Sequence, residues 1–197
     1  MKDMRTNHTA SQPSPASKAK AAMPMRAVAL TRRMTTLLGE IVLVANAQGD
    51  ALQGIYFVRQ KHFPDDTATW REAQQTPLLE TAEAQLHEYF AGARTTFELP
   101  LAPVGTPFQR RVWQAIAEVP FGATIAYAEL ARRIGMASAV RAAAAATGRN
   151  PLTVVIPCHR IVGSDGGMTG YAGGLERKRA LLDLERRAGG AAARKVA

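Results

Sequence analysis

The hydrophobic and polar positions in the first half of the chain follow two different periods. Short apolar or alternating runs between turn residues are typical of strands, whereas apolar residues three or four positions apart indicate an amphipathic helix. The helical spacing includes Leu79, Ala82, Leu86 and Tyr89. The expected elements are strands over 36–46, 51–58 and 94–101, with a turn at 47–50, and a helix from Pro77 to Gly92. Residues 33–104 are therefore predicted to form a small α+β domain.

The second half of the chain shows mostly helical spacing, after a linker over 102–106. Pro107 suits the first turn of a helix, and Gly135 separates two shorter helices in the outline of a helix-turn-helix. Ser138 is the predicted N-cap of the second of these. The expected elements are a helix from Pro107 to Pro120, helices over 127–134, 138–147 and 175–187, and a buried strand over 152–156. Residues 105–188 are therefore predicted to form a mostly helical domain.

Both ends of the chain lack a sustained apolar period. Residues 1–32 are rich in Ala, Ser, Pro, Thr, Lys and Arg, and are predicted to be a disordered basic tail. Residues 189–197 are predicted to be a flexible tail. The first segment lacks the apolar core of a secretory signal peptide, and no apolar run in the chain has the length of a membrane span. These patterns favour a cytoplasmic protein without a membrane segment.

The formal net charge of +9 is unevenly distributed. Residues 35–104 carry four basic and nine acidic side chains, whereas residues 105–185 carry ten basic and six acidic ones. A polyanion is attracted to the positively charged surface. The distribution therefore predicts that DNA, if it is the partner, meets only the second domain.

The second helix of the predicted helix-turn-helix contains five consecutive alanines, 142–146. It carries almost nothing that could read base edges in a major groove, where Arg, Asn and Gln usually make the contacts. One interpretation is a strong helix former that packs against its neighbours. The other is that small side chains let the helix lie close to another surface, such as a minor groove, with Arg141 reaching into it.

Cys158 is the single cysteine of the chain. It excludes an internal disulfide and a multi-cysteine zinc site, and it fits a reducing compartment. A lone cysteine can be a small core hydrophobe, but His159 and Arg160 beside it also suit a reactive thiol. Neighbours in an extended segment point to opposite faces, so contact between imidazole and sulfur needs a bend over 157–160 or a bridging water.

The motif Pro157-Cys158-His159-Arg160, with Gly148-Arg149-Asn150-Pro151 before it and Gly170-Tyr171-Ala172-Gly173-Gly174-Leu175-Glu176-Arg177-Lys178 after it, resembles the O6-alkylguanine-DNA alkyltransferase family. The resemblance is close over 105 to about 186 and looser over 35–104. It implies an α+β fold with a small ribonuclease-H-like N-terminal domain and a mostly helical C-terminal domain with a winged helix-turn-helix. It also implies DNA repair by irreversible, single-turnover transfer of a methyl or alkyl group from O6-alkylguanine, and also from O4-alkylthymine, to the cysteine.

The resemblance assigns catalytic tasks residue by residue. Cys158 matches the family's nucleophile, and His159 matches the histidine that takes the thiol proton through a water. Glu185 matches the carboxylate that orients this histidine, as in a nucleophile–base–orienter triad. Asn150 matches a residue that steadies the active-site loop. Tyr127 resembles the tyrosine that donates a hydrogen bond to the departing guanine and contacts the adjacent phosphate.

The same resemblance assigns residues to DNA and substrate binding. Arg141 resembles the arginine that fills the gap left by an extruded base, on a slim helix that places Ala142 in the minor groove. Ser164 resembles a serine that contacts the DNA backbone, and Ile161 and Tyr171 resemble apolar walls of the base pocket. The implied partner is double-stranded DNA bound through its minor groove by a monomer. No metal and no cofactor are implied.

The sequence departs from the family pattern at a few positions. Ala144 and Ala145 stand where many relatives carry a glycine pair, and Ala172 stands where some carry serine. The zinc site of some members and the cysteine-rich regulatory module of some bacterial relatives cannot form with one cysteine. Two other functions remain as alternatives: a lesion sensor that binds without transfer, and a thiol hydrolase or peptidase.

Overall fold

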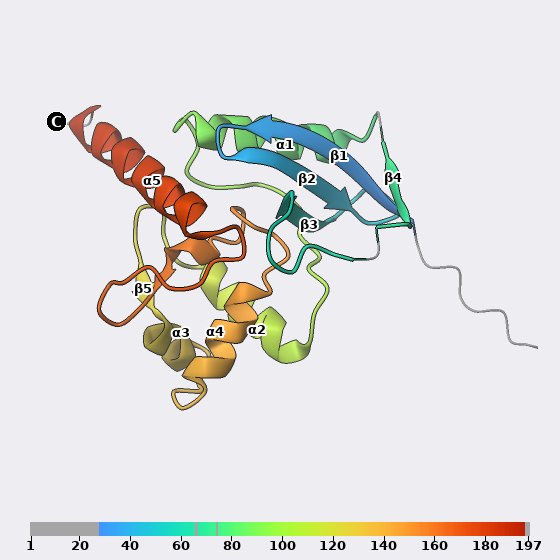
Figure 1. Cartoon of the computed structure of the whole chain (residues 1–197). Helices are drawn as coiled ribbons and strands as arrows, with labels where there is room; N and C mark the ends of the chain where they lie inside the picture. Colours follow the sequence, from blue (N-terminus) through green and yellow to red (C-terminus); the bar gives the residue numbers. More distant parts are fainter. Residues whose placement is uncertain (1–27, 66, 74, 196–197) are drawn as a thin grey trace, which may run out of the picture.

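The computed structural model describes residues 28–65, 67–73 and 75–195 (Figure 1). The part of the predicted tail over 1–27 lies outside these residues. The chain folds into a sheet with one covering helix, followed by a group of helices around two short strands, which confirms the α+β class. The predicted N-terminal boundary is wrong at residues 29–32, because these residues already belong to the sheet.

The N-terminal sheet has the order β3-β2-β1-β4. Its first three strands form an antiparallel meander, and β4 pairs parallel to β1. Helix α1 packs against β1 and β2 (Figure 1). The strands are β1 (Ala29–Thr36), β2 (Gly39–Ala45), β3 (Leu52–Phe57) and β4 (Trp70–Glu72), and the helix is α1 (Pro77–Phe90).

Two predictions for this sheet are corrected. The predicted strand 36–46 is only the second arm of a hairpin, whose turn is made by Gly39 at φ +109° and by the Thr36 hydroxyl, which accepts the Leu38 N–H at 3.1 Å. The first arm was missed because Arg32 and Arg33 interrupt its apolar pattern; Arg32 pairs with Glu83 of α1 at 2.5 Å. The predicted strand 94–101 forms a single bridge, from Leu101 to Leu52.

The C-terminal part is built mainly from helices, as predicted. Helix α2 begins at a capping box in which Thr106 and Gln109 bond reciprocally, with Pro107 at the first position. Helices α3 and α4 contact each other across a turn at Gly135, which has φ +72°. The elements are α2 (Pro107–Ala117), β5 (Ile125–Ala126), α3 (Tyr127–Arg133), α4 (Val140–Gly148), a 3-10 turn η1 (Cys158–Arg160), β6 (Ile161–Val162) and α5 (Leu175–Lys195).

Three further details of this part differ from the predictions. The N-cap of α4 is Ala139, with no side-chain hydrogen bond, and not Ser138. Helix α5 continues to Lys195, through most of the segment predicted as a flexible tail over 189–197. Residues 152–156 are almost entirely buried but form no regular strand, because the chain reverses at Val154, which has φ +74°.

The two halves of the molecule share one hydrophobic core. Leu152 and Val154 join the same cluster as Ile55 of β3, and backbone bonds connect Ile55 to Pro151 (2.8 Å) and Thr153 (3.1 Å). The segment after α4 is thus attached to the edge of the N-terminal sheet. This attachment fixes the segment that leads into Cys158.

Candidate active site

Cys158 begins the 3-10 turn η1 and is only 4% exposed. Its Sγ receives a hydrogen bond from Asn150 Nδ2 at 3.1 Å. The same amide nitrogen donates to the Ile156 carbonyl at 2.8 Å, while Asn150 Oδ1 accepts the Leu152 N–H at 3.0 Å. Asn150 therefore closes the reversal between α4 and η1 and positions the sulfur at its end.

His159 follows on the same turn and is fully buried. Its Nε2 lies 2.8 Å from Glu185 Oε1 on helix α5, whereas its Nδ1 has no hydrogen-bond partner among the described residues. A carboxylate accepts from the imidazole N–H, so the tautomer with hydrogen on Nε2 leaves a free lone pair on Nδ1. The predicted bend over 157–160 is present, and no direct hydrogen bond between His159 and Cys158 is recorded in the described part of the chain.

Glu185 is fully buried and accepts hydrogen bonds from several elements. Arg160 donates from Nε and a terminal nitrogen at 3.0 and 2.8 Å, and the Gly122 N–H donates at 2.9 Å. Tyr89 of helix α1 donates its hydroxyl at 2.7 Å. A buried carboxylate with this many donors stays ionised and fixed in orientation.

The environment controls the protonation of these groups. Burial raises the pKa of Cys158 to about 11, against the hydrogen bond from Asn150 and the charge of Lys178. Burial lowers the pKa of His159, although Glu185 opposes this. Burial would raise the pKa of Glu185, but the hydrogen bonds from His159 and Arg160 outweigh it and lower the pKa to about 2. At neutral pH the site therefore holds a thiol, a neutral imidazole and a carboxylate.

The loop between β6 and α5 is held by a buried lysine. Lys178 is fully buried, and its Nζ donates to the carbonyls of Ile161 at 2.5 Å and Thr169 at 2.9 Å. Burial lowers its pKa to about 8, against the influence of Cys158. Lys178 thereby fixes β6 and the middle of this loop to the first turn of α5.

Two tyrosines lie where this loop approaches the helices. The Tyr127 hydroxyl donates to Thr169 and Gly170 carbonyls at 3.3 and 3.4 Å, and burial raises its pKa. The Tyr171 ring meets the His159 ring edge to face, with centroids 6.5 Å apart. Its hydroxyl is buried without a hydrogen-bond partner in the described part of the chain. Both phenols are therefore neutral near pH 7 and close to the catalytic turn.

A cleft of about 630 Å³ lies over these tyrosines, lined by Lys61, His62, Tyr127, Val140, Arg141, Ala144, Ala145, Gly148, Arg149, Thr169, Gly170, Tyr171 and Ala172. Helix α4 contributes one wall and the loop before α5 another. Ala143 and Ala146 of α4 are buried, whereas Ala142 and Ala145 are exposed. The helix therefore packs on one side, as the first interpretation expects, and the exposed small side chains on its other side are those that the second interpretation requires.

The structure brings most, but not all, of the predicted site residues together. Cys158 with Asn150 and His159 with Glu185 form two hydrogen-bonded pairs that meet at the turn η1, and Tyr127, Tyr171 and Arg141 line the cleft. Ser164 lies exposed on the loop after β6, and Ile161 is fully buried in the core. Neither of these two residues lines the cleft.

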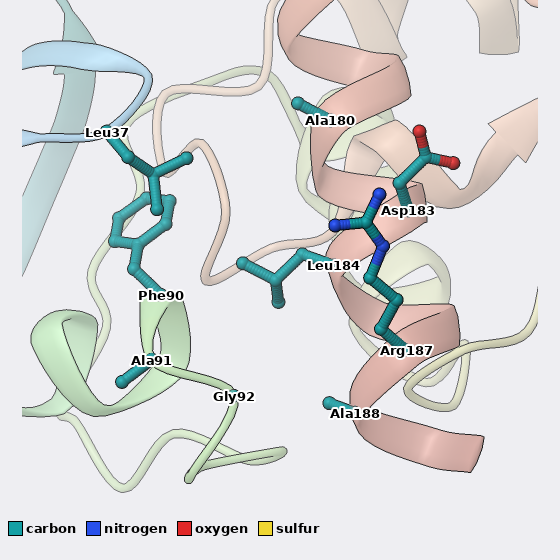
Figure 2. Close-up of a pocket in the computed structure, with 9 residues that line it drawn as sticks. All are labelled: Leu37, Phe90, Ala91, Gly92, Ala180, Asp183, Leu184, Arg187 and Ala188. Atoms are coloured by element: carbon teal, nitrogen blue, oxygen red, sulfur yellow. The ribbon is translucent and has the colours of Figure 1, made fainter. Parts of the chain in front are cut away.

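A second hollow, of about 520 Å³, lies between the turn after β1, the end of α1 and helix α5. Figure 2 shows Leu184 of α5 facing Phe90 and Leu37 across it. None of the predicted site residues lines this hollow. It is a junction between the two halves of the molecule, whereas Tyr127, Arg141 and Tyr171 line the other hollow.

Sequence reasoning missed three residues of the site. The sequence places Arg160 beside the thiol but does not predict its bonds to Glu185, and it gives no role to Lys178 at the end of the Gly170–Lys178 segment. Tyr89 was counted only as an apolar position of its helix, and no sequence signal separates it from a core tyrosine. The described residues contain no group of three or more His, Cys, Asp or Glu side chains suited to a metal, and none of their helices is long and apolar enough to cross a membrane.

A thiol beside a neutral imidazole, which a buried carboxylate orients, is the arrangement of a cysteine nucleophile with a general base. The site thus defines a thiol-dependent transferase or hydrolase, and Tyr127 and Tyr171, which interact electrostatically with Cys158, line a basic cleft. Comparison with known proteins separates these two classes.

The chain belongs to the 6-O-methylguanine DNA methyltransferase family. Residues 107–187 match the model of the family's DNA binding domain, and residues 31–103 match its ribonuclease-like domain. The methylated-DNA–protein-cysteine methyltransferase of Methanosarcina barkeri is 44% identical over 148 residues, which is 75% of this chain and 91% of the relative. The constitutive enzyme of Bacillus subtilis is 43% identical over 154 residues, 77% of this chain and 92% of the relative.

A solved structure is similar over the same region. The fold resembles that of Mycobacterium tuberculosis OGT in complex with DNA, with a TM-score of 0.75 and 37% sequence identity. The match covers 81% of this chain and 94% of that chain. The likeness spans both halves of the molecule, so the predicted two-part architecture is confirmed.

Proposed function

We propose that this protein repairs DNA by transferring a methyl or alkyl group from O6-alkylguanine, and from O4-alkylthymine, to Cys158. It is a methylated-DNA–protein-cysteine methyltransferase. The observation that carries the proposal is the turn η1, where Asn150 donates to the Cys158 sulfur and Glu185 hydrogen-bonds the neighbouring His159. Family membership identifies the reaction as a transfer, and the geometry supports these residues as its machinery.

The first step is activation of the thiol. With a pKa of about 11, the Cys158 thiol needs a base to react at neutral pH. His159 Nδ1 is the unprotonated nitrogen of a neutral ring, and a water between it and Sγ would carry the proton. Glu185 stabilises the imidazolium that forms, as an orienting carboxylate does in a triad.

The second step is the displacement. The sulfur attacks the alkyl carbon, the new S–C bond forms and the C–O6 bond breaks, with the electron pair passing to the guanine. The neutral phenol of Tyr127, which lines the cleft, would give a proton to the departing base. The thioether product has no acidic proton and is a poor leaving group, so the reaction is irreversible and each molecule acts once.

The substrate base must leave the duplex to reach the buried sulfur. We propose that the protein binds double-stranded DNA as a monomer through the minor groove. The exposed alanine side of α4 then lies against the DNA, with Ala142 in the minor groove. Arg141 then fills the gap left by the extruded nucleotide, and Tyr171 bounds the base. Ser164, on the exposed loop, is proposed to contact the DNA backbone, and Ile161 supports the pocket from the core behind it.

Because Cys158 must remain a thiol, we propose the reducing cytoplasm as the place of action. The function is tested by mixing the protein with a duplex that contains O6-methylguanine and recording its mass. One added methyl group on Cys158, stable and limited to one per molecule, is the expected result. An unchanged protein mass with bound DNA would indicate a sensor, and repeated conversion of substrate would indicate a hydrolase.

A further inference from the structure

One part of the cleft wall comes from the N-terminal domain. Lys61 and His62, in the loop that follows β3, line the same cleft as Arg141 and Arg149 of the α4 region. Both side chains are exposed. The charge distribution of the sequence predicted that only the second domain meets DNA, but these two residues belong to the first.

The loop is fixed in place by bonds to both domains. Gln60 is only 6% exposed, and its Oε1 accepts the Phe57 N–H at 2.9 Å, which closes the turn after β3. The Lys61 N–H donates to the Ala172 carbonyl at 2.8 Å, in the segment that carries Tyr171. The position of Lys61 is therefore tied directly to the loop beside the catalytic turn.

The backbone of this loop is strained at two positions. Arg59 has φ +65° and His62 has φ +60°, and neither is a glycine. Such left-handed conformations cost free energy and persist where the surrounding structure enforces them, which is often at binding sites. Here the strained turn directs Lys61 and His62 toward the cleft.

The charges around the cleft are of one sign. Lys61, Arg141 and Arg149 line it together with His62, and no carboxylate is among its lining residues in the described part of the chain. Burial lowers the pKa of His62, and the charges of Arg149 and Lys61 lower it further. Cations gathered without a carboxylate repel one another, and an anion placed between them would remove this repulsion.

We propose that Lys61 and His62 form a phosphate-binding rim on the N-terminal side of the cleft, which contacts the backbone of the bound DNA. The inference rests on the proposed function, since it assumes that DNA occupies this cleft. The Lys61 ammonium supplies a charge and hydrogen bonds to a phosphate oxygen, and the His62 imidazole supplies one N–H donor. Such contacts set the register of the protein on the duplex and read no sequence.

The experiment measures the salt dependence of DNA binding for Lys61→Gln and His62→Gln. Arg71→Gln is the matched control, because Arg71 is an exposed cation of the same domain that does not line the cleft. Dissociation constants are measured between 50 and 200 mM salt for a duplex with O6-methylguanine and for its unmodified counterpart. The logarithm of the association constant falls with the logarithm of the salt concentration, and each lost phosphate contact makes this negative slope shallower by about 0.9.

For Lys61→Gln we expect a negative slope that is shallower by about one, with the same loss of affinity for both duplexes. Arg71→Gln should keep the wild-type slope. His62→Gln is expected to weaken binding with a smaller change of slope, because its imidazole is neutral at pH 7. Lys61→Arg, which keeps the charge, should retain the wild-type slope. An unchanged slope in Lys61→Gln would overturn the inference, whether or not affinity falls.

The two proposals fail separately in this design. Transfer is recorded by the mass of the wild-type protein on the same duplex, and a wild type that takes no methyl group contradicts the proposed function. A wild type that takes the methyl group, together with a Lys61→Gln slope equal to that of wild type, contradicts only the phosphate-binding rim.

Discussion

The hydroxyl of Tyr89 donates a hydrogen bond to Glu185 Oε1 at 2.7 Å, and these two residues are 96 positions apart in the chain. Tyr89 belongs to helix α1 of the N-terminal domain, whereas Glu185 orients His159 from helix α5. The N-terminal domain therefore contributes a buried donor to the catalytic group. The ribonuclease-like part of the chain therefore supplies one of the hydrogen bonds that the Glu185 carboxylate accepts.

The first prediction concerns this bond. Tyr89→Phe should lower the free energy of unfolding by about 1.5–3 kcal/mol, the range for a hydrogen bond to a charged group. It should also slow methyl transfer, because Glu185 holds His159 less firmly. Urea unfolding and single-turnover rates provide the measurements. Tyr56→Phe, in the aromatic cluster with Phe63 and Trp70, is the control and should change the transfer rate little. Equal slowing in both variants would show that the Tyr89 bond has no special effect on the site.

The second prediction concerns acid stability. The folded pKa of Glu185 is about 2, below its ordinary value of 4.5, so the unfolded state binds more protons between these two values. The resulting stabilisation is complete above about pH 4.5 and is lost as the pH falls toward 2. At 1.36 kcal/mol per pKa unit it amounts to about 3 kcal/mol.

Urea unfolding from pH 7 to pH 3 tests this expectation. Glu185→Gln should be less stable at pH 7 by about 3–5 kcal/mol, because Arg160 is left buried without its carboxylate. Its stability should also depend less on pH below 4.5. Glu176→Gln, at an exposed position in the first turn of α5, serves as the control and should follow the wild-type curve. A Glu185→Gln curve as steep as that of wild type would assign the acid transition to other groups.

The third prediction is that Cys158→Ala abolishes methyl transfer and retains DNA binding. The sulfur is buried and does not line the cleft, whereas the proposed binding depends on α4 and on phosphate contacts. Release of radiolabelled methyl groups from DNA and a gel-shift titration measure the two properties. Removal of the label by the alanine variant would mean that another group is the nucleophile.

The fourth prediction separates base extrusion from chemistry through Arg141, an exposed residue of the cleft wall. Arg141→Ala should slow repair of duplex DNA much more than reaction with the free base O6-methylguanine, which needs no extrusion. Each 1.36 kcal/mol of lost stabilisation corresponds to about tenfold in rate. Single-turnover rates on the two substrates are the measurement.

Arg141→Lys is the matched variant, because lysine keeps the charge but loses the planar, stacking guanidinium. It should restore DNA affinity better than it restores the repair rate. If Arg141→Ala slowed the free base and the duplex equally, Arg141 would belong to the catalytic group or to the fold, and its task in extrusion would be disproved.

The amino-acid pattern alone was enough to predict the class of fold, the order of most elements and the residues of the motif. Helical spacing and terminal signals predicted α1, α2 and α3 closely, since an amphipathic face and its Pro or Gly boundaries are local properties. The motif around Cys158 identified the family, which the comparisons confirm. The sequence pattern does not predict the first part of β1, because Arg32 and Arg33 interrupt its apolar positions. The strand forms nonetheless because its backbone pairs with β2.

The connections within the site follow only from the folded molecule. Spacing marks Tyr89 as a buried position of α1, but it does not show that the hydroxyl reaches a carboxylate of the other domain. Residues 152–156 have the composition of a strand, yet the reversal at Val154 and the Asn150 amide replace it with a turn that presents the sulfur. Lys61 likewise lines the cleft while its backbone N–H is bonded to Ala172, 111 positions away in the chain. Each of these features depends on contacts between residues far apart in the chain, which no local pattern of hydrophobic and polar residues encodes.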